Sequence, residues 1–314
     1  DAPVAQAGAF TVAEDAAVVN GAVTATDVDA GATLSFALNG AAPAGLTFNS
    51  NGTYSFNPAN AAYQSLGVNQ QTIITVPYTV TDNAGATSTA NLVITVTGTN
   101  DTPVANANTV AATEDNALTI APATLLGNDT DIDNGTTLSI TSVQGAVNGT
   151  VALVGGNVVF TPAANYNGPA SFTYTVSDGN GGTSTATVTV NVAAVNDAPV
   201  AQAGAFTVAE DAAVVNGAVT ATDVDAGATL SFSLNGAAPA GLTFNSNGTY
   251  SFNPANAAYQ SLGVNQQTVL TVPYTVTDNA GATSTANLVI TVTGTNDTPV
   301  ANANTVAATE DNAL

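Results

Sequence analysis

The chain of 314 residues contains 22 acidic residues and no lysine, arginine or histidine, which gives a net charge of −22. Without basic side chains it has no positive surface for nucleic acid or anionic membranes, so neither is an expected partner. The absence of cysteine and histidine excludes disulfides, thiol catalysis and the usual zinc sites. No apolar run approaches the ~18 residues of a membrane span. The hydrophobic content of 45% nevertheless predicts a folded chain.

The first 118 residues return almost unchanged at residues 197–314. The two copies differ at three positions only, Ala37/Ser233, Ile73/Val269 and Ile74/Leu270. Copying a catalytic domain along one polypeptide gains little, whereas copying a spacer or a polyvalent scaffold gains length or valency. Residues 297–314 reproduce residues 101–118, and we interpret them as the beginning of a further, truncated unit of a longer protein.

A recurring Asn-Asp-x-Pro motif divides the chain into units of roughly one hundred residues, a normal domain size. The motif occurs at residues 100–103, 196–199 and 296–299. The predicted domains are therefore residues 1–99, residues 101–196, residues 197–296 as a near-copy of the first, and residues 297–314 as the truncated fourth.

Strand signals follow one another along each unit. In the first unit, aliphatic and aromatic residues alternate with threonine or proline over residues 74–81. After a turn at 82–85, a second alternation over residues 90–97 places Ala90, Leu92, Ile94 and Val96 between Asn91, Val93, Thr95 and Thr97. The second unit repeats this pattern over residues 172–176 and 186–192, with a glycine-rich turn at 178–182. Alternation with period two and β-branched enrichment predicts half-buried strands. About seven short strands in each unit, with no sustained helical period, predict an all-β chain of β-sandwiches.

The acidic residues gather at the predicted domain ends. In a sandwich with strands A to G, an Asp-x-Asp motif falls in the B–C loop and another aspartate in the F–G loop, both at the pole where the chain enters. A Glu-Asp pair falls in the A–B turn at the opposite pole, beside the exit linker. The first entry pole holds Asp1, Asp27, Asp29 and Asp82. The first junction gathers Glu14, Asp15, Asn100, Asp101, Asp131, Asp133 and Asp178. The second gathers Glu114, Asp115, Asn196, Asp197, Asp223, Asp225 and Asp278, and the incomplete third begins with Glu210, Asp211, Asn296 and Asp297.

Such clusters require a cation. At ~8 Å and an effective dielectric constant of ~20, each pair of like charges costs roughly 2 kcal/mol. Calcium relieves this repulsion, because it takes 6–8 oxygen ligands from carboxylates, amides and carbonyls. The alternative is that aspartate simply favours turns. That explains single positions, but it explains neither the recurring Asp-x-Asp motif nor the scarcity of acids elsewhere. The predicted cofactor is therefore Ca²⁺, with Asp15 and Asp115 the weaker candidates because one of two adjacent side chains usually points away.

The units resemble known bacterial repeats. Residues 24–34, Thr-Ala-Thr-Asp-Val-Asp-Ala-Gly-Ala-Thr-Leu, together with Asn-Gly-Thr-Tyr at 51–54, resemble the VCBS-type repeat of large bacterial surface proteins. Residues 125–133, 160–166 and 174–183 of the second unit resemble the cadherin-like tandem repeats of giant RTX-type adhesins and biofilm proteins. The matches together cover almost the whole chain.

This resemblance implies a linear array of Ig-like (cadherin-like) β-sandwich domains, calcium at the linkers, and type I secretion to the surface of a Gram-negative bacterium. By analogy with cadherins, the ligands are the linker Asn-Asp, the Asp-x-Asp motif and the glutamate of the A–B turn. The linker here is shorter than the Asp-x-Asn-Asp-Asn of animal cadherins. That departure implies fewer ions at each junction.

Four functions compete. The first is a calcium-stiffened extender that projects the adhesive region of an extracellular adhesin and supports adhesion or biofilm formation, its partners being calcium and neighbouring repeats. The second is a self-assembling fibre, sheath or matrix in which identical chains pair by strand addition, for which residues 297–314 are a candidate segment. The third is direct ligand binding by a domain tip, which no aromatic cluster supports. Enzyme activity is the weakest, because the same acids recur at every junction and no distinct cleft is implied.

Overall fold

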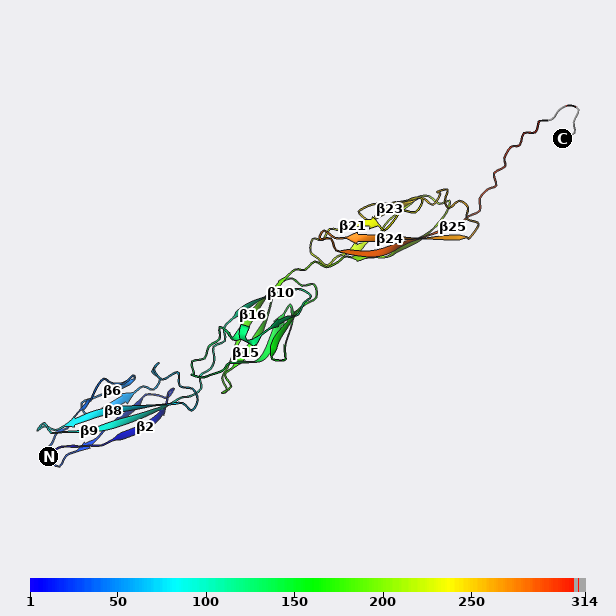
Figure 1. Cartoon of the computed structure of the whole chain (residues 1–314). Coiled ribbons are helices and arrows are strands. Elements are labelled where there is room, and N and C mark those ends of the chain that lie inside the picture. The colour runs from blue at the N-terminus through cyan, green and yellow to red at the C-terminus, as the bar shows by residue number, and fades with distance from the viewer. Residues whose placement is uncertain (308–309, 311–314) are drawn as a thin grey trace. The chain divides into compact units, whose positions relative to one another are not determined.

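The structure, a computed structural model, describes residues 1–307 and residue 310. The chain divides into two compact units, Asp1–Ala194 and Val195–Leu314. The first unit contains two β-sandwiches and the second unit contains one (Figure 1). Among the described residues, residues 298–307 form no strand, and the rest of the predicted fourth unit, residues 308–309 and 311–314, lies outside the description. The predicted domain limits stay a prediction.

The first sandwich is built from two sheets and a short strand pair. The four-stranded sheet has the order β2-β9-β8-β5, with β2 parallel to β9. Its strands are β2 (Gly8–Ala13), β9 (Thr87–Thr97), β8 (Gln71–Thr81) and β5 (Ser35–Leu38). The three-stranded sheet is formed by β3 (Val19–Ala22), β7 (Thr53–Phe56) and β6 (Leu46–Phe48). The short pair joins β1 (Val4–Ala5) to β4 (Ala25–Thr26).

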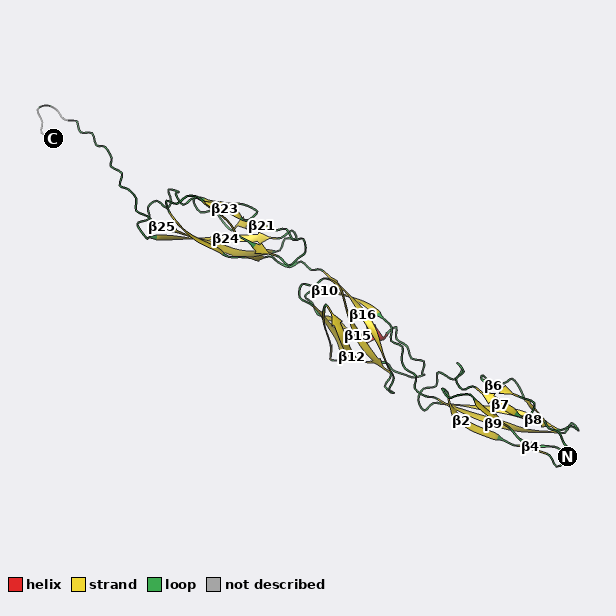
Figure 2. Cartoon of the chain, turned by 180° about the vertical axis from the view of Figure 1, so that it is seen from behind, coloured by secondary structure: helices red, strands yellow, loops and turns green. Residues whose placement is uncertain are grey.

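The second sandwich follows the same plan with a different sequence. Its four-stranded sheet consists of β10 (Asn108–Thr113), β16 (Thr183–Ala193), β15 (Gly168–Ser177) and β12 (Ser139–Val147). Its three-stranded sheet consists of β11 (Leu118–Ile120), β14 (Asn157–Pro162) and β13 (Gly149–Val154). The short helix α1 (Pro122–Leu126), the red segment in Figure 2, was not predicted. It begins with a proline in its first turn, and its Leu125 is buried.

The third sandwich, in the second unit, repeats the first strand for strand. Its four-stranded sheet consists of β18 (Gly204–Ala209), β25 (Thr283–Thr293), β24 (Gln267–Thr277) and β21 (Ser231–Leu234). Its three-stranded sheet consists of β19 (Val215–Ala218), β23 (Thr249–Phe252) and β22 (Leu242–Phe244). The short pair joins β17 (Val200–Ala201) to β20 (Ala221–Thr222).

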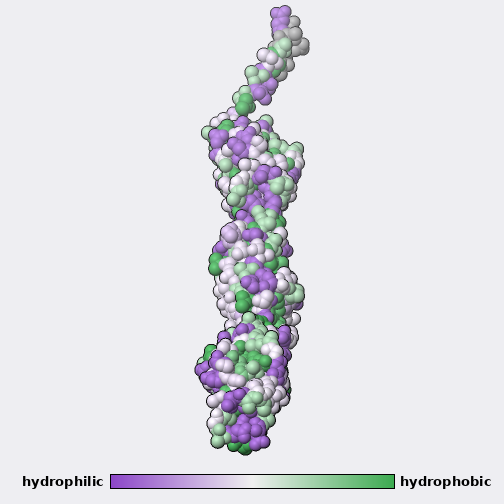
Figure 3. Space-filling view, turned by 90° about the vertical axis from the view of Figure 1, so that its left-hand side faces the viewer, coloured by the Kyte–Doolittle hydropathy of each residue, from purple (hydrophilic) through white to green (hydrophobic). Residues whose placement is uncertain are grey.

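The predicted alternation is the one that builds the cores. In β8, Val76, Tyr78 and Val80 are buried, while Pro77 between them is exposed. In the second sandwich, Phe172 and Tyr174 occupy the corresponding buried positions. Each sandwich thus encloses its own apolar core between its two sheets. On the visible face, hydrophilic and hydrophobic side chains are mixed (Figure 3). The all-β prediction is confirmed.

Candidate functional site

Three carboxylates meet where the first sandwich passes into the second. Glu14 follows β2, Asp101 lies in the linker, and Asp133 lies in the loop before β12. One oxygen from each lies within 4.8 Å of the other two. Glu14 is completely buried and Asp133 is 5% exposed. The linker and both sandwiches therefore contribute to a single acidic cluster.

The backbone holds Glu14 in place. Its N–H donates to the carbonyl of Thr97, at the end of β9, over 3.0 Å. The Thr99 N–H donates to Glu14 Oε1 over 2.8 Å. Because β2 and β9 run parallel, the residue that follows one strand lies beside the chain that leaves the other. The topology thus places this side chain against the exit linker and leaves Oε2 for another partner.

The Asp-x-Asp loop positions the other end of the cluster. The Asp133 N–H donates to Asp131 Oδ1 over 2.9 Å, the self-bonding pattern that makes aspartate a turn former. The linker N–H of Asp101 donates to Asp133 Oδ2 over 3.0 Å. The loop and the linker are therefore joined directly, and each of the two loop aspartates keeps one oxygen outside these bonds.

Asp178 acts on its neighbours differently. Its Oδ2 accepts a hydrogen bond of 2.8 Å from Asn100 Nδ2. Its Oδ1 accepts backbone N–H groups from Asn180 at 2.7 Å and Gly182 at 3.0 Å. Burial raises the pKa of Asp178, but the hydrogen bonds from Asn100 and the backbone outweigh it and lower the pKa below its ordinary value. Asp178 therefore orients the Asn100 amide so that its carbonyl oxygen is available.

Five buried oxygens at this linker lack a hydrogen-bond partner in the described part of the chain. A buried polar atom without a partner is costly, and native structures contain few of them. Here they come from the linker and from both sandwiches, and three of the five residues are those whose carboxylate oxygens lie within 4.8 Å of one another. Calcium prefers oxygen ligands of this kind. They are Glu14 Oε2, Asn100 Oδ1, Asp101 Oδ2, Asp131 Oδ2 and Asp133 Oδ1.

The electrostatics of the cluster have the same origin. Burial raises the pKa of Glu14, and the negative charges of Asp15 and Asp101 add to the increase. Burial likewise raises the pKa of Asp101, followed by repulsion from Asp15, Asp133 and Asp131. Since the chain has no basic side chain, no residue of its own can offset this negative charge. The oxygen-only donor set fits a hard divalent cation.

The second unit contains the same entry pole. Asp197 N–H donates to Asp225 Oδ2 over 2.9 Å, and Asp225 N–H donates to Asp223 Oδ1 over 2.9 Å. Asn196 Nδ2 donates to Asp278 Oδ2 over 2.8 Å. This hydrogen bond is the main cause of the lowered pKa of Asp278. The buried Asp223 Oδ2 has no hydrogen-bond partner among the described residues. The arrangement of the first linker is therefore reproduced in an independent sandwich.

The first entry pole repeats the Asp-x-Asp hydrogen bond. Asp29 N–H donates to Asp27 Oδ1 over 2.9 Å, and Asp27 Oδ2 is buried without a hydrogen-bond partner in the described chain. The terminal ammonium of Asp1 contacts Asp29 Oδ2, and this contact raises the pKa of the ammonium. Asp82 Oδ1 accepts the N–H groups of Ala84 and Ala86, both at 2.8 Å. Asp1 thus lies against the loop that contains Asp27 and Asp29, while Asp82 Oδ1 is bonded within its own turn.

The exit poles also repeat. The N–H of Thr295 donates to Glu210 Oε1 over 2.8 Å, and buried Glu210 Oε2 has no hydrogen-bond partner within the described residues. Asp15 and Asp211 each accept the hydroxyl of the linker threonine, at 2.7 and 2.5 Å. Asn296 and Asp297 are exposed.

The exit pole of the second sandwich is less uniform. Glu114 is 1% exposed, and its Oε2 accepts Asn167 Nδ2 over 3.4 Å. Asp115 has a φ of 59° and accepts Asn165 N–H over 3.1 Å. Asp115 is therefore engaged with its own sandwich.

The model for bacterial cadherin-like domains matches residues 1–98 and 196–294, which is more than half of the chain, and the model for cadherin-like domains matches residues 99–193. The chain belongs to the bacterial cadherin-like domain family. A search of curated proteins gave no significant match.

Solved cadherin ectodomains share the fold of these bacterial cadherin-like repeats. Mouse cadherin-23 EC22-24 is 16% identical with a TM-score of 0.58, over 94% of this chain and 99% of that one. Mouse protocadherin-24 EC1-3 is 18% identical with a TM-score of 0.59, over 91% and 96%. A protocadherin gammaB7 EC3-6 cis-dimer structure is 18% identical with a TM-score of 0.60, over 93% and 74%. At these identities the likeness shows the fold.

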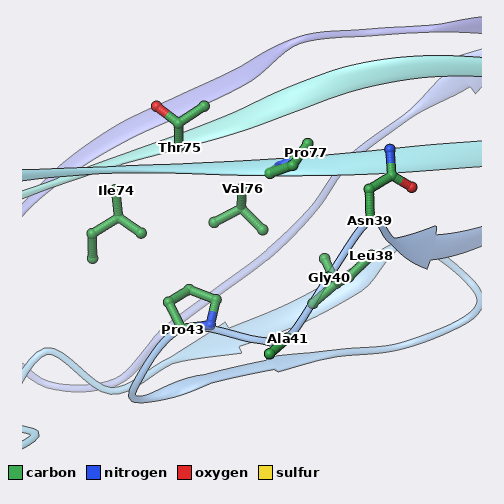
Figure 4. Close-up of a pocket in the computed structure, with 9 residues that line it drawn as sticks. All are labelled: Leu38, Asn39, Gly40, Ala41, Pro43, Ile74, Thr75, Val76 and Pro77. Carbon is green, nitrogen blue, oxygen red and sulfur yellow. The ribbon is translucent and has the colours of Figure 1, made fainter.

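Sequence reasoning missed one polar network and one hollow of the cadherin-like repeats. The Tyr174 hydroxyl donates to Asp129, 2.9 Å from Oδ2, so this acid belongs to the second sandwich's interior network rather than to the linker cluster. Burial and Asp129 raise the pKa of Tyr174. A hollow in the first sandwich is lined by Leu38, Pro43, Val76 and neighbouring residues, none of them charged (Figure 4). Within the described residues, no helix combines the length and apolarity that crossing a membrane requires.

Proposed function

We propose that this chain is a calcium-stiffened, repetitive extender of a large secreted bacterial surface adhesin of the VCBS and RTX type. In this role the cadherin-like repeats hold an adhesive region away from the cell and support cell adhesion or biofilm formation. The proposal includes an extracellular, surface-attached location and type I secretion, both of which rest on the sequence resemblance.

The buried, unbonded oxygens at the first linker carry the proposal. Glu14, Asn100, Asp101, Asp131 and Asp133 each offer one such oxygen. Five side-chain ligands leave room for a backbone carbonyl or water within the 6–8 oxygens that calcium takes. Zinc would require histidine or cysteine, which the chain lacks. Magnesium would have to give up most of its bound water to use this many protein ligands.

In this role the proposed calcium ligands come from three parts of the chain. Glu14 binds from the first sandwich, Asp131 and Asp133 bind from the second, and Asn100 and Asp101 bind from the linker. Asp178 holds the Asn100 amide in orientation through its hydrogen bond. A bound ion offsets the negative charge, and any bend that separates the two sandwiches must remove ligands from it. The ion therefore converts a short linker into a stiff joint.

We extend the proposal to the second linker because its residues repeat the sequence pattern of the first and because the third sandwich has the same entry pole as the second. The entry pole of the third sandwich supplies Asn196, Asp197, Asp223 and Asp225, with Asp278 holding Asn196. Glu114 stands at the position of Glu14 in the repeat pattern. Asp1, Asp27, Asp29 and Asp82 are proposed as half of a similar site, and so are Glu210, Asp211, Asn296 and Asp297.

Small-angle X-ray scattering of the whole chain tests the proposal. We expect the radius of gyration to be larger and the conformational spread smaller in calcium than in chelator, with magnesium giving little of the effect. Equal scattering in calcium and chelator would contradict the extender role. Growth of the scattering mass with protein concentration would instead favour the self-assembling fibre or matrix.

A further inference from the structure

The first sandwich carries a long loop at its exit pole, beside the linker cluster, where a backbone hydrogen bond from Leu66 reaches the Glu14 carboxylate. Residues 57–70 connect β7 to β8, and the same sequence returns at residues 253–266, between β23 and β24. Tyr63 anchors the loop to its own sandwich, because its buried ring packs near Phe56 and its hydroxyl donates to the Ala44 carbonyl over 2.7 Å. The end of the loop then lies beside the second sandwich.

This loop forms hydrogen bonds with both backbone polar groups of Asn134 in the second sandwich. Asn134 N–H donates to the Ser65 carbonyl over 3.0 Å, and Gln70 Nε2 donates to the Asn134 carbonyl over 3.1 Å. Gln70 Oε1 also accepts Gly67 N–H over 3.3 Å, so the same side chain stiffens the loop. A Cβ at Gly67 would approach the Asn134 carbonyl oxygen to 3.2 Å. None of these contacts involves a carboxylate of the cluster, although Asn134 directly follows Asp133.

The copy of the loop in the second unit, at residues 253–266, differs from the first loop in the exposure of its residues. Gly67 is buried and Ser65 is half-buried, whereas the equivalent Gly263 and Ser261 are exposed. The three atoms nearest to a Cβ at Gly263 would all belong to the side chain of Gln266, from its own loop. The internal arrangement is otherwise retained, since Gly263 N–H donates to Gln266 Oε1 over 2.9 Å. The loop is therefore preformed before a partner sandwich contacts it.

The second sandwich has no comparable loop at its own exit pole. Its strands β14 and β15 are joined by residues 163–167 alone. This short connection is bound to its own sandwich, because Asn165 N–H donates to Asp115 Oδ1 over 3.1 Å and the Tyr166 hydroxyl donates to the Pro169 carbonyl over 2.7 Å.

We infer that residues 57–70 form a docking surface for the Asp-x-Asp-Asn loop of the sandwich that follows. We call residues 57–70 the clasp. The clasp holds the first sandwich against the second without a bound ion, whereas the second sandwich offers no such loop to the sandwich that follows it. The two linkers thus differ in what keeps them ordered. This inference builds on the proposed function, since it concerns the joints that calcium stiffens, but the clasp itself operates in the absence of calcium.

The test uses the full chain, which has no cysteine, so spin labels attach only at the cysteines that are introduced. Spin labels on Thr47→Cys with Ala152→Cys report on the first linker, and labels on Ala152→Cys with Thr243→Cys report on the second. All three positions are exposed. In chelator, pulsed electron paramagnetic resonance should give a distance distribution narrower by about twofold across the first linker, because few contacts restrain a joint without a clasp.

A matched pair of variants separates the clasp from the fold. Gly67→Val should push the Asn134 carbonyl away and broaden the first distribution to the width of the second. Gly263→Val makes the same change in the copy and should leave both distributions unchanged, with melting temperatures verifying that both variants fold. Equal widths in unsubstituted protein with chelator, or no broadening by Gly67→Val, would overturn the clasp. If calcium fails to narrow either distribution, the extender proposal fails while the chelator data still decide the clasp.

Discussion

The entry poles of the second and third sandwiches hold their linkers alike despite different sequences. Asp131-Ile132-Asp133 precedes one core and Asp223-Val224-Asp225 precedes the other. The bond from the linker N–H to the second aspartate is 3.0 Å in one and 2.9 Å in the other. The bond from the linker asparagine to the F–G aspartate is 2.8 Å in both. The comparison teaches that these polar positions and the local backbone define the site, while the sandwich behind them is free to vary.

Removing calcium should have the largest effect, because it affects every linker site at once. Binding stabilises the folded state by mass action, by about 2.7 kcal/mol at a free calcium concentration of 100 times the Kd. Without the ion, repulsion among the carboxylates returns. We expect the melting temperature to rise with calcium concentration in scanning calorimetry and to change little with magnesium. A melting temperature insensitive to calcium would refute the metal assignment at both poles.

Replacing the second aspartate of one Asp-x-Asp motif should abolish calcium binding at that linker and leave calcium binding at the other linker unchanged. Asp133→Ala removes a proposed ligand and the acceptor of the Asp101 N–H, and losing a hydrogen bond to a charged group costs about 1.5–3 kcal/mol. Asp225→Ala makes the same change at the third sandwich. Isothermal titration calorimetry should show that each variant loses the ions of one linker only. If either variant abolished all calcium binding, the two sites would not be independent.

Neutralising the orienting aspartate should weaken calcium binding less than removing a ligand. Asp178→Asn keeps an oxygen for the backbone N–H groups but places an amide opposite the Asn100 amide that Asp178 now holds. Substituting a group that orients a metal ligand typically costs 10–100-fold in affinity. A calcium titration of Asp178→Asn should show about that loss at the first linker, and Asp278→Asn the same at the second. An unchanged affinity in both would remove the orienting role.

The smallest predicted effect is a pH dependence of the calcium-free protein. The pKa values of Glu14 and Asp101 are raised above their ordinary values of 4.5 and 3.8, chiefly by burial. Their contribution to stability is therefore fully present below the ordinary values and is lost as pH rises through the raised ones. In chelator the melting temperature should fall between mildly acidic and neutral pH, and calcium should cancel the fall. Glu14→Gln should flatten the dependence, and an equally steep curve would contradict its assigned cause.

Period-two alternation was enough to predict the long strands, because burial of Val76, Tyr78 and Val80 follows directly from residue type. The same patterning, with turn preferences, predicted that Glu14 and Asp133 lie at opposite poles of their sandwiches. It could not predict helix α1, whose five residues are too few to display a helical period. It also missed the contact of Gln70 with Asn134, since both partners are ordinary polar loop residues and only the three-dimensional arrangement brings them together.

The parallel pairing of the first long strand with the last has a mechanical consequence. In the first sandwich β2 and β9 are parallel neighbours from Gly8 paired with Leu92 to Ala13 paired with Thr97. The chain enters at one pole and leaves at the other, so tension along the polypeptide pulls these two strands in opposite directions along their common axis. Their hydrogen bonds are then loaded together in shear rather than opened one after another. The same parallel pairing occurs in the other two sandwiches, so each is loaded in the same way.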